Sequence, residues 1–569
     1  MSILSRKFVI VGGVAGGAST AARLRRLNEE DNIIMFERGP HVSFSNCCLP
    51  YHLSGIVEDS DELVLMKPDK FYSQYRIDAR VYTEVIAIDR EKKEVRVKNV
   101  VNGKEYTESY DKLILSPGAK AIVPPIKGLE EVNSFTVRNV VDIAKLNNFI
   151  NDNETKDITV IGGGFIGVEV CENLIEAGYN VTLVEAMNQI MKPFDYDMVQ
   201  ILHKEMYDRG VNLILGDKVA FFEKDTVVLA SGKKIKADAV VMAIGVTPET
   251  DLAKEAGIEI GQTGGIKVDQ NYRTNDENIF AVGDAVEVFN PLTGQITRLP
   301  LAGPAQKQAR AVADYINGIP NRNTGYIGSS CIQVFGYNGA STGLTEGLIK
   351  ALNLNINYDV VRVIPQDKVG LMPGSEPLHF KLIYEVPTGR ILGAQSIGRG
   401  AADKRVDIIA TLIKFNGTLE DLRDLELCYA PPFGTAKDVV NHAALVGSNL
   451  MQKTFKQVYV TKVRELVQEG AFIVDVREED EYENGHIINA KNIPLSQIRD
   501  RLDEIPKDRP VYLHCRSAQR SYNACLALKH LGFNNIYNIA GGFMGICFYE
   551  YFNDMTQKRD KIVTKYNFD

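Results

Sequence analysis

The sequence has no tryptophan, few cysteines and no long apolar run, and the last two shortages each exclude a class of protein. Among its 569 residues the eight cysteines are scattered, without the spacing of a zinc site or the density of a disulfide scaffold. No segment approaches the roughly 20 consecutive apolar residues that span a bilayer, and the apolar run in MSILSRKFVIVGG is too short for a signal peptide. We therefore expect reduced thiols, no metal, no membrane association and a cytoplasmic location.

Basic residues are also fewer than acidic ones, 65 against 73. The formal net charge is −8 and the isoelectric point is near 5.7, which argues against nucleic acid or an anionic membrane as the main partner. Local basic clusters that hold a small anion remain compatible with this balance. The length is far above that of one domain, so we expect several domains.

Two stretches have the pattern of a nucleotide-binding βαβ unit. In KFVIVGGVAGGASTAARLRRL, residues 7–27, a buried strand leads into a glycine turn and an amphipathic helix. The same order recurs in DITVIGGGFIGVEVCENLIEAGYNVTLVEA, residues 157–186. Glycines at such a turn let backbone N–H groups approach a pyrophosphate at the helix N-terminus. The sequence therefore predicts two dinucleotide sites.

The two copies differ in their glycines. The first has Val14 where the strict fingerprint has its middle glycine, whereas the second matches GxGxxG in full. Glu37 and Glu185 end the strands that follow, where a carboxylate can bind ribose hydroxyls. Glu185 has no basic residue beside it, so NADH is preferred over NADPH. The motif glycines are Gly12, Gly16 and Gly17 in the first copy and Gly162, Gly164 and Gly167 in the second.

Two shorter stretches, YDKLILSPGA (110–119) and TNDENIFAVGDAV (274–286), each read as an apolar strand that ends in a tight turn. Asp284 follows Gly283 in the second stretch. Its carboxylate either binds a ribityl hydroxyl or is an ordinary turn aspartate. Taken by themselves, these residues favour the turn.

The chain changes character after the nucleotide-binding region. Residues 326–450 combine strand–turn–strand segments with helices, which is typical of an α+β domain. Residues 456–569 alternate short strands with helical runs, which indicates a small α/β domain. The predicted fold class is α/β, with two Rossmann-like domains followed by these two.

These motifs in combination resemble a known family. The two βαβ units with SPGA and FAVGD, spread over residues 5–450, are similar to the two-domain FAD/NAD(P) disulfide oxidoreductases. Within them, SFSNCCLPY and YAPPFGTAKDVVN resemble coenzyme A-disulfide reductases, and the family also carries a valine before AGG. FIVDVREEDEYENGHIINAKNIPL and HCRSAQRS are similar to rhodanese domains. The whole chain resembles coenzyme A-disulfide reductase–rhodanese fusions, which are NADH-dependent persulfide or polysulfide reductases.

The resemblance implies an architecture and cofactor sites. It implies an FAD-binding domain (1–152 and 275–325), an NAD-binding domain (153–274), a dimerisation domain (326–450) that forms a homodimer, and a rhodanese domain (456–569). The residues implied to bind FAD or NADH are Gly12, Val14, Ala15, Gly16, Gly17, Glu37, Arg38, Ser116, Pro117, Gly118, Gly162, Gly164, Phe165, Ile166, Gly167, Glu185, Gly245, Gly283, Asp284 and Ala302.

The family's redox cysteine aligns with Cys47. A thiolate beside an oxidised flavin can attack a sulfane sulfur or a disulfide and form a mixed disulfide. The chain has no CxxxxC pair, so the substrate would supply the second sulfur. Cys48 stands where relatives carry a small residue, and we expect it to be a small, partly buried side chain, because a disulfide between neighbours is strained.

Other positions carry over as coenzyme A contacts. Helix spacing places Ser19, Arg23 and Arg26 on one face, a pattern that a solvated charged face also explains, but the resemblance implies contact with the nucleotide of coenzyme A. Further residues are implied at the thiol end (Ser43, Asn46) and near the flavin and coenzyme A, supplied across the dimer interface (Tyr429, Lys437).

One stretch departs from the family. Relatives that reduce coenzyme A-disulfide carry a Tyr-Tyr-Pro-Gly stretch, whereas this chain reads GLMPG at 370–374. A proton donor for the leaving thiolate is therefore missing, which leaves Tyr429. A persulfide needs less help, because HS⁻ is a good leaving group, so we expect persulfide to be preferred.

In the tail, Cys515 follows a strand and opens a loop that leads into a helix. Backbone N–H groups, the helix N-terminus, Arg516 and Arg520 favour a thiolate there and stabilise a persulfide anion. A C-x4-R loop also suits a phosphate monoester, but the NIP segment favours sulfur transfer. His486 is interpreted as structural, and His514 either tunes Cys515 or is an ordinary histidine at a strand end.

We predict the following function. Cys515 exchanges sulfane sulfur with coenzyme A, and an FAD-dependent site uses NADH and Cys47 to reduce coenzyme A-persulfide, polysulfide or coenzyme A-disulfide. One rival is an NADH oxidase or peroxidase in which Cys47 cycles through sulfenic acid, although the rhodanese tail has no role in that scheme. Another is a redox sensor that holds coenzyme A as a stable mixed disulfide.

Overall fold

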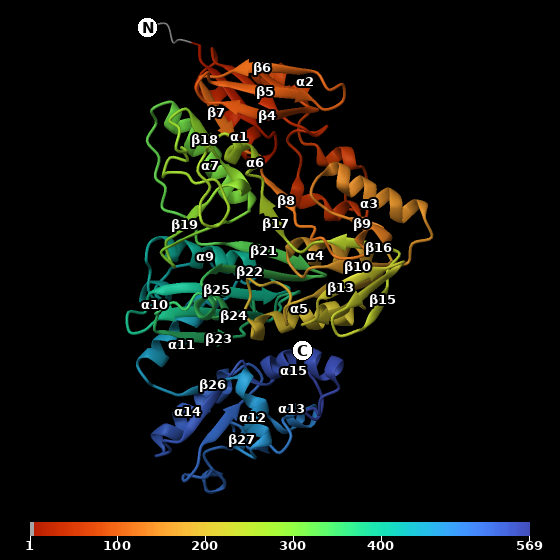
Figure 1. Ribbon diagram of the computed structural model, residues 1–569. Coiled ribbons are helices and arrows are strands. Elements are labelled where there is room, and N and C mark those ends of the chain that lie inside the picture. Colours follow the sequence, from red (N-terminus) through yellow and green to blue (C-terminus); the bar gives the residue numbers. More distant parts are fainter. Residues whose placement is uncertain (1–4, 569) are drawn as a thin grey trace. The chain divides into compact units, whose positions relative to one another are not determined.

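A computed structural model describes residues 5–568, and its contacts divide the chain into two compact units. The first contains residues 1–188 and 214–326, and the second contains 189–213 and 327–569. Each unit is described by itself (Figure 1). Among the described residues, no helix is long and apolar enough to cross a membrane.

The first unit is built around two parallel sheets. One has the strand order β18-β7-β1-β2-β3, so β18 joins β7 although residues 116–278 separate the two strands in the sequence. Helices α1 and α7 pack against each other, and the apolar residues of α1 and β1 share a core with β2. The bounds are β1 Lys7–Val11, α1 Ala15–Leu27, β2 Asn32–Phe36, β3 Ile77–Arg80, β7 Lys112–Leu115, β18 Ile279–Ala281 and α7 Ala302–Ile316.

The other parallel sheet repeats this arrangement, with β11, β10, β16 and β9 as successive neighbours. Its bounds are β9 Ser134–Phe135, β10 Asp157–Ile161, α4 Phe165–Glu176, β11 Asn180–Glu185 and β16 Ala239–Met242. Antiparallel strands flank the two sheets: β4 Thr83–Asp89, β5 Glu94–Asn99, β6 Glu105–Ser109, β13 Val219–Glu223, β14 Thr226–Leu229 and β15 Lys234–Lys236.

The second unit combines an antiparallel sheet with a small parallel one. The antiparallel sheet has the order β21-β22-β25-β24-β23. Helices α9 and α11 contact this sheet and each other, and Val361 of β23 faces Gly447 of α11. The bounds are β21 Ser330–Val334, β22 Tyr337–Gly343, α8 Glu346–Ala351, β23 Tyr358–Val363, β24 Leu378–Glu385, β25 Ile391–Gly398, α9 Ala402–Lys414 and α11 Val439–Met451.

The C-terminal part of the second unit, drawn in blue in Figure 1, is a parallel sheet with the order β26-β30-β29-β27-β28. Its strands and helices enclose two apolar clusters. The bounds are β26 Gln457–Tyr459, α12 Val463–Gln468, β27 Phe472–Asp475, β28 Lys491–Asn492, β29 Val511–His514, α14 Gln519–His530, β30 Ile536–Ala540 and α15 Gly542–Gln557.

Helix α5, Tyr196–Asp208, belongs to this second unit although it lies inside the range predicted for the NAD-binding domain. It packs against α15 and against the antiparallel sheet. The Tyr196 hydroxyl donates to Asn553 Oδ1 at 3.2 Å. Side chains alternate along a strand, so Arg362, which follows Val361, points to the face opposite α11 and pairs with Asp197 of α5.

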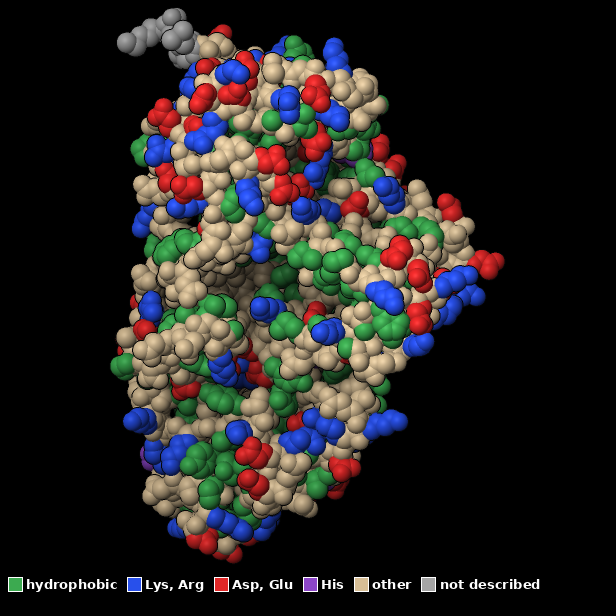
Figure 2. Space-filling model, viewed as in Figure 1, with side chains coloured by type: hydrophobic (Ala, Val, Ile, Leu, Met, Phe, Trp, Pro, Cys, Tyr) green, Lys and Arg blue, Asp and Glu red, His purple; other side chains and the backbone are tan. Residues whose placement is uncertain are grey.

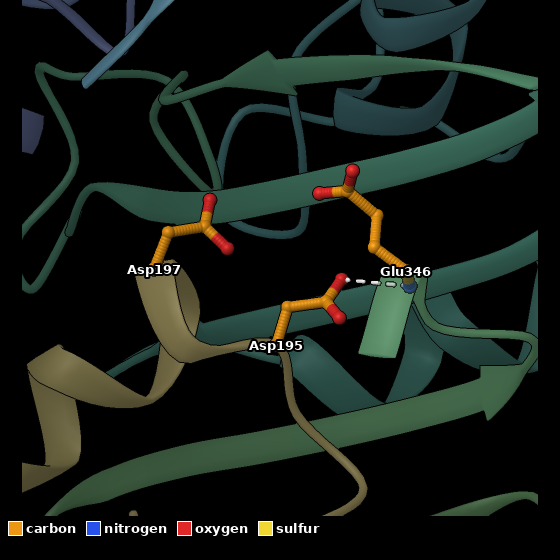
Figure 3. A group of neighbouring side chains, drawn as sticks. All are labelled: Asp195, Asp197 and Glu346. Atoms are coloured by element: carbon orange, nitrogen blue, oxygen red, sulfur yellow. Dashed lines mark hydrogen bonds between the residues drawn. The ribbon is translucent and has the colours of Figure 1, made fainter. Parts of the chain in front are cut away.

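Three acidic side chains meet between α5, α8 and the sheet (Figure 3). The ammonium group of Lys381, whose side chain is 2% exposed, lies 3.0 Å from Asp195, 2.7 Å from Asp197 and 2.7 Å from Glu346. The carboxylates therefore already have a cation at their centre, and the cluster is an ion-pair network. Burial alone would lower the pKa of Lys381, but the carboxylates raise it.

Charge is dispersed over the surface. The face shown in Figure 2 carries Lys and Arg side chains interspersed with Asp and Glu side chains, and no broad field of one sign covers it. The modest negative net charge is therefore spread out there, and any binding of a small anion depends on a local cluster.

Candidate functional site

The first glycine loop opens onto a cavity of about 800 Å³. Glu37 closes β2 and holds the loop, because its carboxylate accepts from the Gly13 N–H at 3.0 Å and from the Gly39 N–H at 2.9 Å. The volume lies in the range of cofactor sites, roughly 300–1,000 Å³. Predicted residues that line the cavity are Gly12, Val14, Ala15, Gly16, Glu37, Arg38, Asn46, Ser116, Pro117, Gly118, Gly283 and Asp284.

The backbone of the first glycine loop leaves no room for a side chain at Gly12 or at Gly17. Gly12 has a φ of +94°, and a Cβ there would lie 2.0 Å from the Ser116 carbonyl oxygen. Gly17 is not on the cavity wall. A Cβ on Gly17 would lie 1.8 Å from the Gly12 oxygen, so this glycine allows the close packing of helix on strand. The cavity and its bare backbone fit a flavin dinucleotide, whose pyrophosphate requires such an approach. Ala302 is exposed, and Ala305 lines the cavity in its place.

The second glycine loop repeats the same geometry. The Gly163 N–H donates to Glu185 at 2.7 Å, and the Met187 N–H donates to the other oxygen of that carboxylate at 2.8 Å. A Cβ on Gly167 would lie 1.9 Å from the Gly162 oxygen. This arrangement fits a second dinucleotide, and the acidic strand end suits a free ribose hydroxyl. Gly164, Phe165 and Ile166 lie at the start of α4, and Gly245 has a φ of +123°.

Cys47 lies on a short 3-10 turn, Asn46–Cys48, and is exposed, whereas Cys48 is half-buried. Partial burial of the thiol and the nearby Glu169 raise the pKa of Cys47, while Arg138 acts in the opposite direction. The buried side-chain oxygen of Asn46 has no hydrogen-bond partner. Because Asn46 lines the large cavity, that oxygen is available to a ligand there.

The sequence reasoning missed Glu169, on the half-buried side of α4. Burial and the neighbouring Glu172 raise the pKa of Glu169 to about 7. Glu169 also contributes, after burial, to raising the pKa of Tyr51 to about 12. A carboxylate that titrates near neutrality beside an exposed thiol can hold or release a proton at physiological pH. An acidic residue amid the apolar positions of the predicted helix is the signal that could have revealed it.

Asp284 is not a free turn aspartate. Its carboxylate accepts from Arg138 at 3.2 Å, and both residues line the large cavity. Burial raises the pKa of Asp284 although Arg138 lowers it. Arg138 also donates to the Ala119 carbonyl at 2.7 Å, so it ties the two predicted strand–turn stretches together. No motif in the sequence points to Arg138.

A second cavity of the first unit, about 400 Å³, is lined by four of the residues predicted to contact coenzyme A. Arg23 pairs with Asp314 at 2.6 Å, and Arg310 approaches the same carboxylate at 3.4 Å. Two arginines with one carboxylate leave positive charge for a phosphate. Its wall includes Ser19, Arg23, Arg26, Ser43, Gln306 and Arg310, of which the sequence reasoning missed Gln306 and Arg310.

Cys515 of the second unit follows β29 and is buried. Ser521 of α14 lies with its hydroxyl 3.7 Å from the Cys515 sulfur, and it also donates to Asn538 at 2.6 Å. Asn538 in turn donates to the Ala518 carbonyl at 3.2 Å. Ala518 has a φ of +75° just before α14, so the loop bends sharply around the sulfur. The sequence reasoning missed Ser521 and Asn538.

Charged groups surround this loop. Arg520 makes a two-pronged ion pair with Glu481 at 2.6 and 2.7 Å, and this contact, together with Cys515, raises the pKa of Arg520. Arg516 lies on the same loop as Cys515. The backbone carbonyl of Arg516 accepts a hydrogen bond from the Met544 N–H at 3.0 Å. The guanidinium of Arg520 is therefore held beside the thiol, as a persulfide anion requires.

His514 and His486, which the sequence analysis singled out, make different contacts. His514 is buried 3.6 Å from Asp475, and burial lowers its pKa, opposed by that carboxylate. His486 stacks on Tyr482 with ring centroids 3.8 Å apart and contacts the Tyr482 carbonyl at 2.9 Å. These contacts are those of residues that hold the fold together.

The remaining predicted residues are on exposed segments of the second unit. Tyr429 is 50% exposed, and Lys437 is exposed just before α11. In the GLMPG stretch, Leu371 is 94% exposed. Phe433, between Tyr429 and Lys437, is 78% exposed. Apolar side chains this exposed are typical of a surface that another chain covers.

Three known protein families match successive parts of the chain. The family described as pyridine nucleotide-disulphide oxidoreductase matches residues 6–309. The dimerisation domain of that family matches residues 330–439, and a rhodanese-like domain matches residues 459–547. A coenzyme A disulfide reductase of Staphylococcus epidermidis is 34% identical over 436 residues, which cover 76% of this chain and 98% of the relative.

Solved structures give the same assignment over nearly the full length. Reduced CoADR-RHD of Bacillus anthracis is 44% identical with a TM-score of 0.92, covering 96% of this chain and 98% of that one. An NAD-dependent persulfide reductase from A. fulgidus is 33% identical with a TM-score of 0.90, covering 95% and 99%. A water-forming NADH oxidase from Lactobacillus brevis is 28% identical with a TM-score of 0.75 and covers 79% of this chain.

Proposed function

Because the chain belongs to the pyridine nucleotide-disulphide oxidoreductase family and carries a rhodanese-like domain, we propose that it is an NADH-dependent reductase of coenzyme A-persulfide. One observation carries the proposal. The chain holds an exposed thiol, Cys47, on the turn whose Asn46 lines the flavin-sized cavity, and also a buried thiol, Cys515, held beside the guanidinium of Arg520. The relatives named for coenzyme A disulfide and persulfide reduction support it.

The chemistry at Cys47 is sulfur–sulfur cleavage. The Cys47 thiolate attacks the inner sulfur of coenzyme A-persulfide, the S–S bond breaks, HS⁻ leaves, and a mixed disulfide of Cys47 with coenzyme A forms. FAD bound in the large cavity would pass two electrons from NADH to that disulfide, which releases both thiolates. Glu169, with a pKa of about 7, exchanges protons near Cys47.

The arginine-lined cavity would hold the nucleotide end of coenzyme A. Arg23, Arg26 and Arg310 present guanidinium groups that suit phosphates in a bidentate manner. Ser43 lines the same cavity. Its backbone N–H donates to the carbonyl oxygen of Gly13 in the first glycine loop at 2.8 Å. A cofactor-sized substrate anchored here would extend toward the nearby turn of Cys47.

Persulfide is proposed as the preferred substrate over coenzyme A-disulfide. The GLMPG stretch offers the apolar and exposed Leu371 instead of a tyrosine hydroxyl, so a poorly leaving thiolate would lack the proton donor that this stretch supplies in the relatives. HS⁻ leaves without one. The rhodanese domain would supply or accept the sulfane sulfur through Cys515, and fusion of the two activities raises the effective concentration of one site for the other.

A homodimer is proposed on the match to the dimerisation domain. The exposed Leu371, Tyr429 and Phe433 would then be covered by the partner, and Tyr429 and Lys437 would contribute to the partner's flavin site. Sedimentation or light scattering of the purified protein tests the oligomeric state directly.

The decisive assay is anaerobic NADH oxidation with coenzyme A-persulfide and, separately, with coenzyme A-disulfide. We expect persulfide to be used faster, Cys47→Ser to lose both activities, and the neighbouring Cys48→Ser control to keep most of them. Equal rates would refute the substrate preference. Negligible rates with both, together with fast NADH oxidation by O₂, would indicate an oxidase, and a stable Cys47–coenzyme A adduct would indicate a sensor.

The tail is tested on its own reaction. Cys515→Ser is expected to abolish sulfur transfer from thiosulfate to cyanide while NADH-dependent reduction of added coenzyme A-persulfide continues. Retention of full thiosulfate activity in this variant would show that the rhodanese assignment of Cys515 is wrong.

A further inference from the structure

An acidic segment of the rhodanese-like domain is joined to the Cys515 loop by an ion pair between Glu481 and Arg520. It covers residues 478–483 and contains helix α13, Glu479–Glu483, which is labelled in the blue part of Figure 1. Five of its six residues carry carboxylates: Glu478, Glu479, Asp480, Glu481 and Glu483. Glu481 is half-buried, whereas the other four are exposed. The segment therefore places negative charge at one side of the loop, and Glu481 is its point of contact.

The carboxylate of Glu481 is held from two directions. Its Oε2 accepts from Arg520 Nη1 at 2.6 Å, and its Oε1 accepts from Arg520 Nη2 at 2.7 Å. Glu481 also belongs to a capping box at the start of α13, in which the Glu478 backbone N–H donates to Oε2 at 3.4 Å. The hydrogen bonds from Arg520 lower the pKa of Glu481. The carboxylate is therefore ionised, and the pair is formed, at neutral pH.

Arg520 connects this carboxylate to the thiol. It lies in the first turn of α14, five residues after Cys515, and its pKa is raised first by Glu481 and then by Cys515. A guanidinium has five N–H donors, so Arg520 can donate to Glu481 through two nitrogens and still donate to the sulfur. The net charge of the Arg520–Glu481 pair is zero, however. Arg520 therefore orients a sulfur anion without adding a full positive charge to the loop.

The charge balance around the thiol follows from this pair. Of the two arginines in the Cys515 loop, Arg516 adds positive charge, whereas the charge of Arg520 is offset by Glu481. The exposed carboxylates of residues 478–483 add negative charge on the same side. Coulomb repulsion grows with the negative charge of an approaching molecule. The loop is therefore built to accept a sulfur donor of low charge more readily than a dianion.

Two classes of sulfur donor differ in this property. Thiosulfate is a dianion, and its leaving group is sulfite. A persulfide R–S–SH has a thiolate as its leaving group and carries only the charge of R and of its own terminal sulfur. In coenzyme A-persulfide the phosphates lie at the far end of an uncharged pantetheine arm, so the sulfur end can approach Cys515 without them. The charge of the donor near its sulfur therefore separates thiosulfate from persulfides.

We propose that Glu481 determines the specificity of the Cys515 loop by offsetting the charge of Arg520, so that the loop takes sulfur from a persulfide of low net charge in preference to thiosulfate. This assignment rests on the proposed function, because it names the donor class for Cys515. In the exchange, the Cys515 thiolate attacks the terminal sulfur of R–S–SH, the S–S bond breaks, and R–S⁻ leaves with the bonding electrons. Cys515 becomes the persulfide, the proton stays on the transferred sulfur, and no outside oxidant or reductant takes part.

Glu481→Gln tests the assignment, because it keeps the size of the side chain and removes its charge. Mass spectrometry after rapid alkylation measures persulfide formation on Cys515 of the full-length holoenzyme. The donors are thiosulfate and cysteamine persulfide, whose ammonium group leaves it without net negative charge. We expect Glu481→Gln to raise the ratio of the thiosulfate rate to the persulfide rate by about tenfold at subsaturating donor. The gain is expected in the half-saturating concentration of thiosulfate, with the limiting rate unchanged.

Glu483→Gln is the matched control. It removes the same charge from the same short helix, but Glu483 is exposed and the pair with Arg520 is made by Glu481. We expect this control to change the donor ratio by less than about twofold. The effect of Glu481→Gln is expected to shrink in about 1 M salt, where the Debye length falls to about 3 Å. Because both donors are compared on one preparation, the ratio does not depend on the fraction of protein that is folded.

Three results would overturn the assignment. The first is an unchanged donor ratio in Glu481→Gln, and the second is an equal change in Glu483→Gln. The third is an equal loss with both donors in Glu481→Gln, which would show that Glu481 only positions Arg520. Failure of the proposed function is distinguishable, because neither donor would then load sulfur onto Cys515 of the unsubstituted protein, and Cys515→Ser would keep its thiosulfate activity.

Discussion

Lys381 is the residue whose removal tests the architecture of the second unit most directly. Its ammonium group lies within 3.0 Å of three carboxylates, those of Asp195, Asp197 and Glu346, and its side chain is 2% exposed. Lys381→Met keeps the length and the apolar stem of the side chain but removes the charge. The three acidic groups then remain together without their central cation.

The expected cost follows from the burial. Removal of one partner from a buried ion pair destabilises by about 3–5 kcal/mol, because the other partner is left uncompensated. For folding units of roughly 150–250 residues, each kcal/mol lowers the melting temperature by about 2–4 °C. We therefore expect Lys381→Met to lower the melting temperature of the second unit by about 10 °C. Lys404→Met, at an exposed lysine of α9, is the matched control and is expected to change it little.

The pH dependence gives a second measurement with a definite sign. In the native protein, burial raises the pKa of Asp197, but Lys381 and Arg362 outweigh burial and hold it below its ordinary value. Without Lys381 this pKa rises above the unfolded value. A group with a raised folded-state pKa contributes stability at low pH and loses it as the pH rises through that pKa. The deficit of Lys381→Met is therefore expected to be larger at pH 8 than at pH 5.

Calorimetry or circular dichroism at the two pH values measures both effects. Addition of Asp197→Asn to Lys381→Met removes one uncompensated charge and is expected to recover part of the loss. A melting temperature of Lys381→Met within about 2 °C of the wild type, or a deficit that grows toward acid pH, would refute the ion-pair account of this cluster.

Two further variants test the first unit. Glu169→Gln removes a negative charge near Cys47, so we expect a lower pKa of the Cys47 thiol. The pH dependence of Cys47 alkylation in the reduced protein measures this pKa. An unchanged profile would show that Glu169 does not act on Cys47. Gly12→Ala places a Cβ 2.0 Å from the Ser116 oxygen, so we expect loss of bound flavin by absorbance. Gly103→Ala, also at positive φ but with no neighbour within 4 Å, is expected to retain it.

Local pattern was sufficient for some features of the site. The glycine loops could be predicted because Gly12 and Gly162 follow apolar strands within a few residues, and chain connectivity alone brings strand, turn and helix together. Cys47 and Cys515 could be predicted because they lie in short motifs that resemble those of known families. Asp284 was ambiguous, and its pairing with Arg138 depends on a residue 146 positions earlier.

Groups that act through long-range contacts could not be predicted. Glu169 lies in the correctly placed helix α4, but its raised pKa depends on burial, which packing creates. Lys381 reads in the sequence as a lysine within an apolar strand, and its carboxylates come from two other segments, the start of helix α5 and the start of helix α8. Arg362 likewise pairs with Asp197, a residue 165 positions earlier in the chain.

The sequence by itself therefore determined the elements whose physics is local: the order of domains, the two nucleotide-binding turns and the two thiols on their loops. The tertiary structure alone decided which charges face one another and how deeply Glu169 and Lys381 are buried. The reason is physical, because desolvation and Coulomb energies depend on the dielectric surroundings and on distances of a few ångströms, and both arise only when segments far apart in the chain have packed.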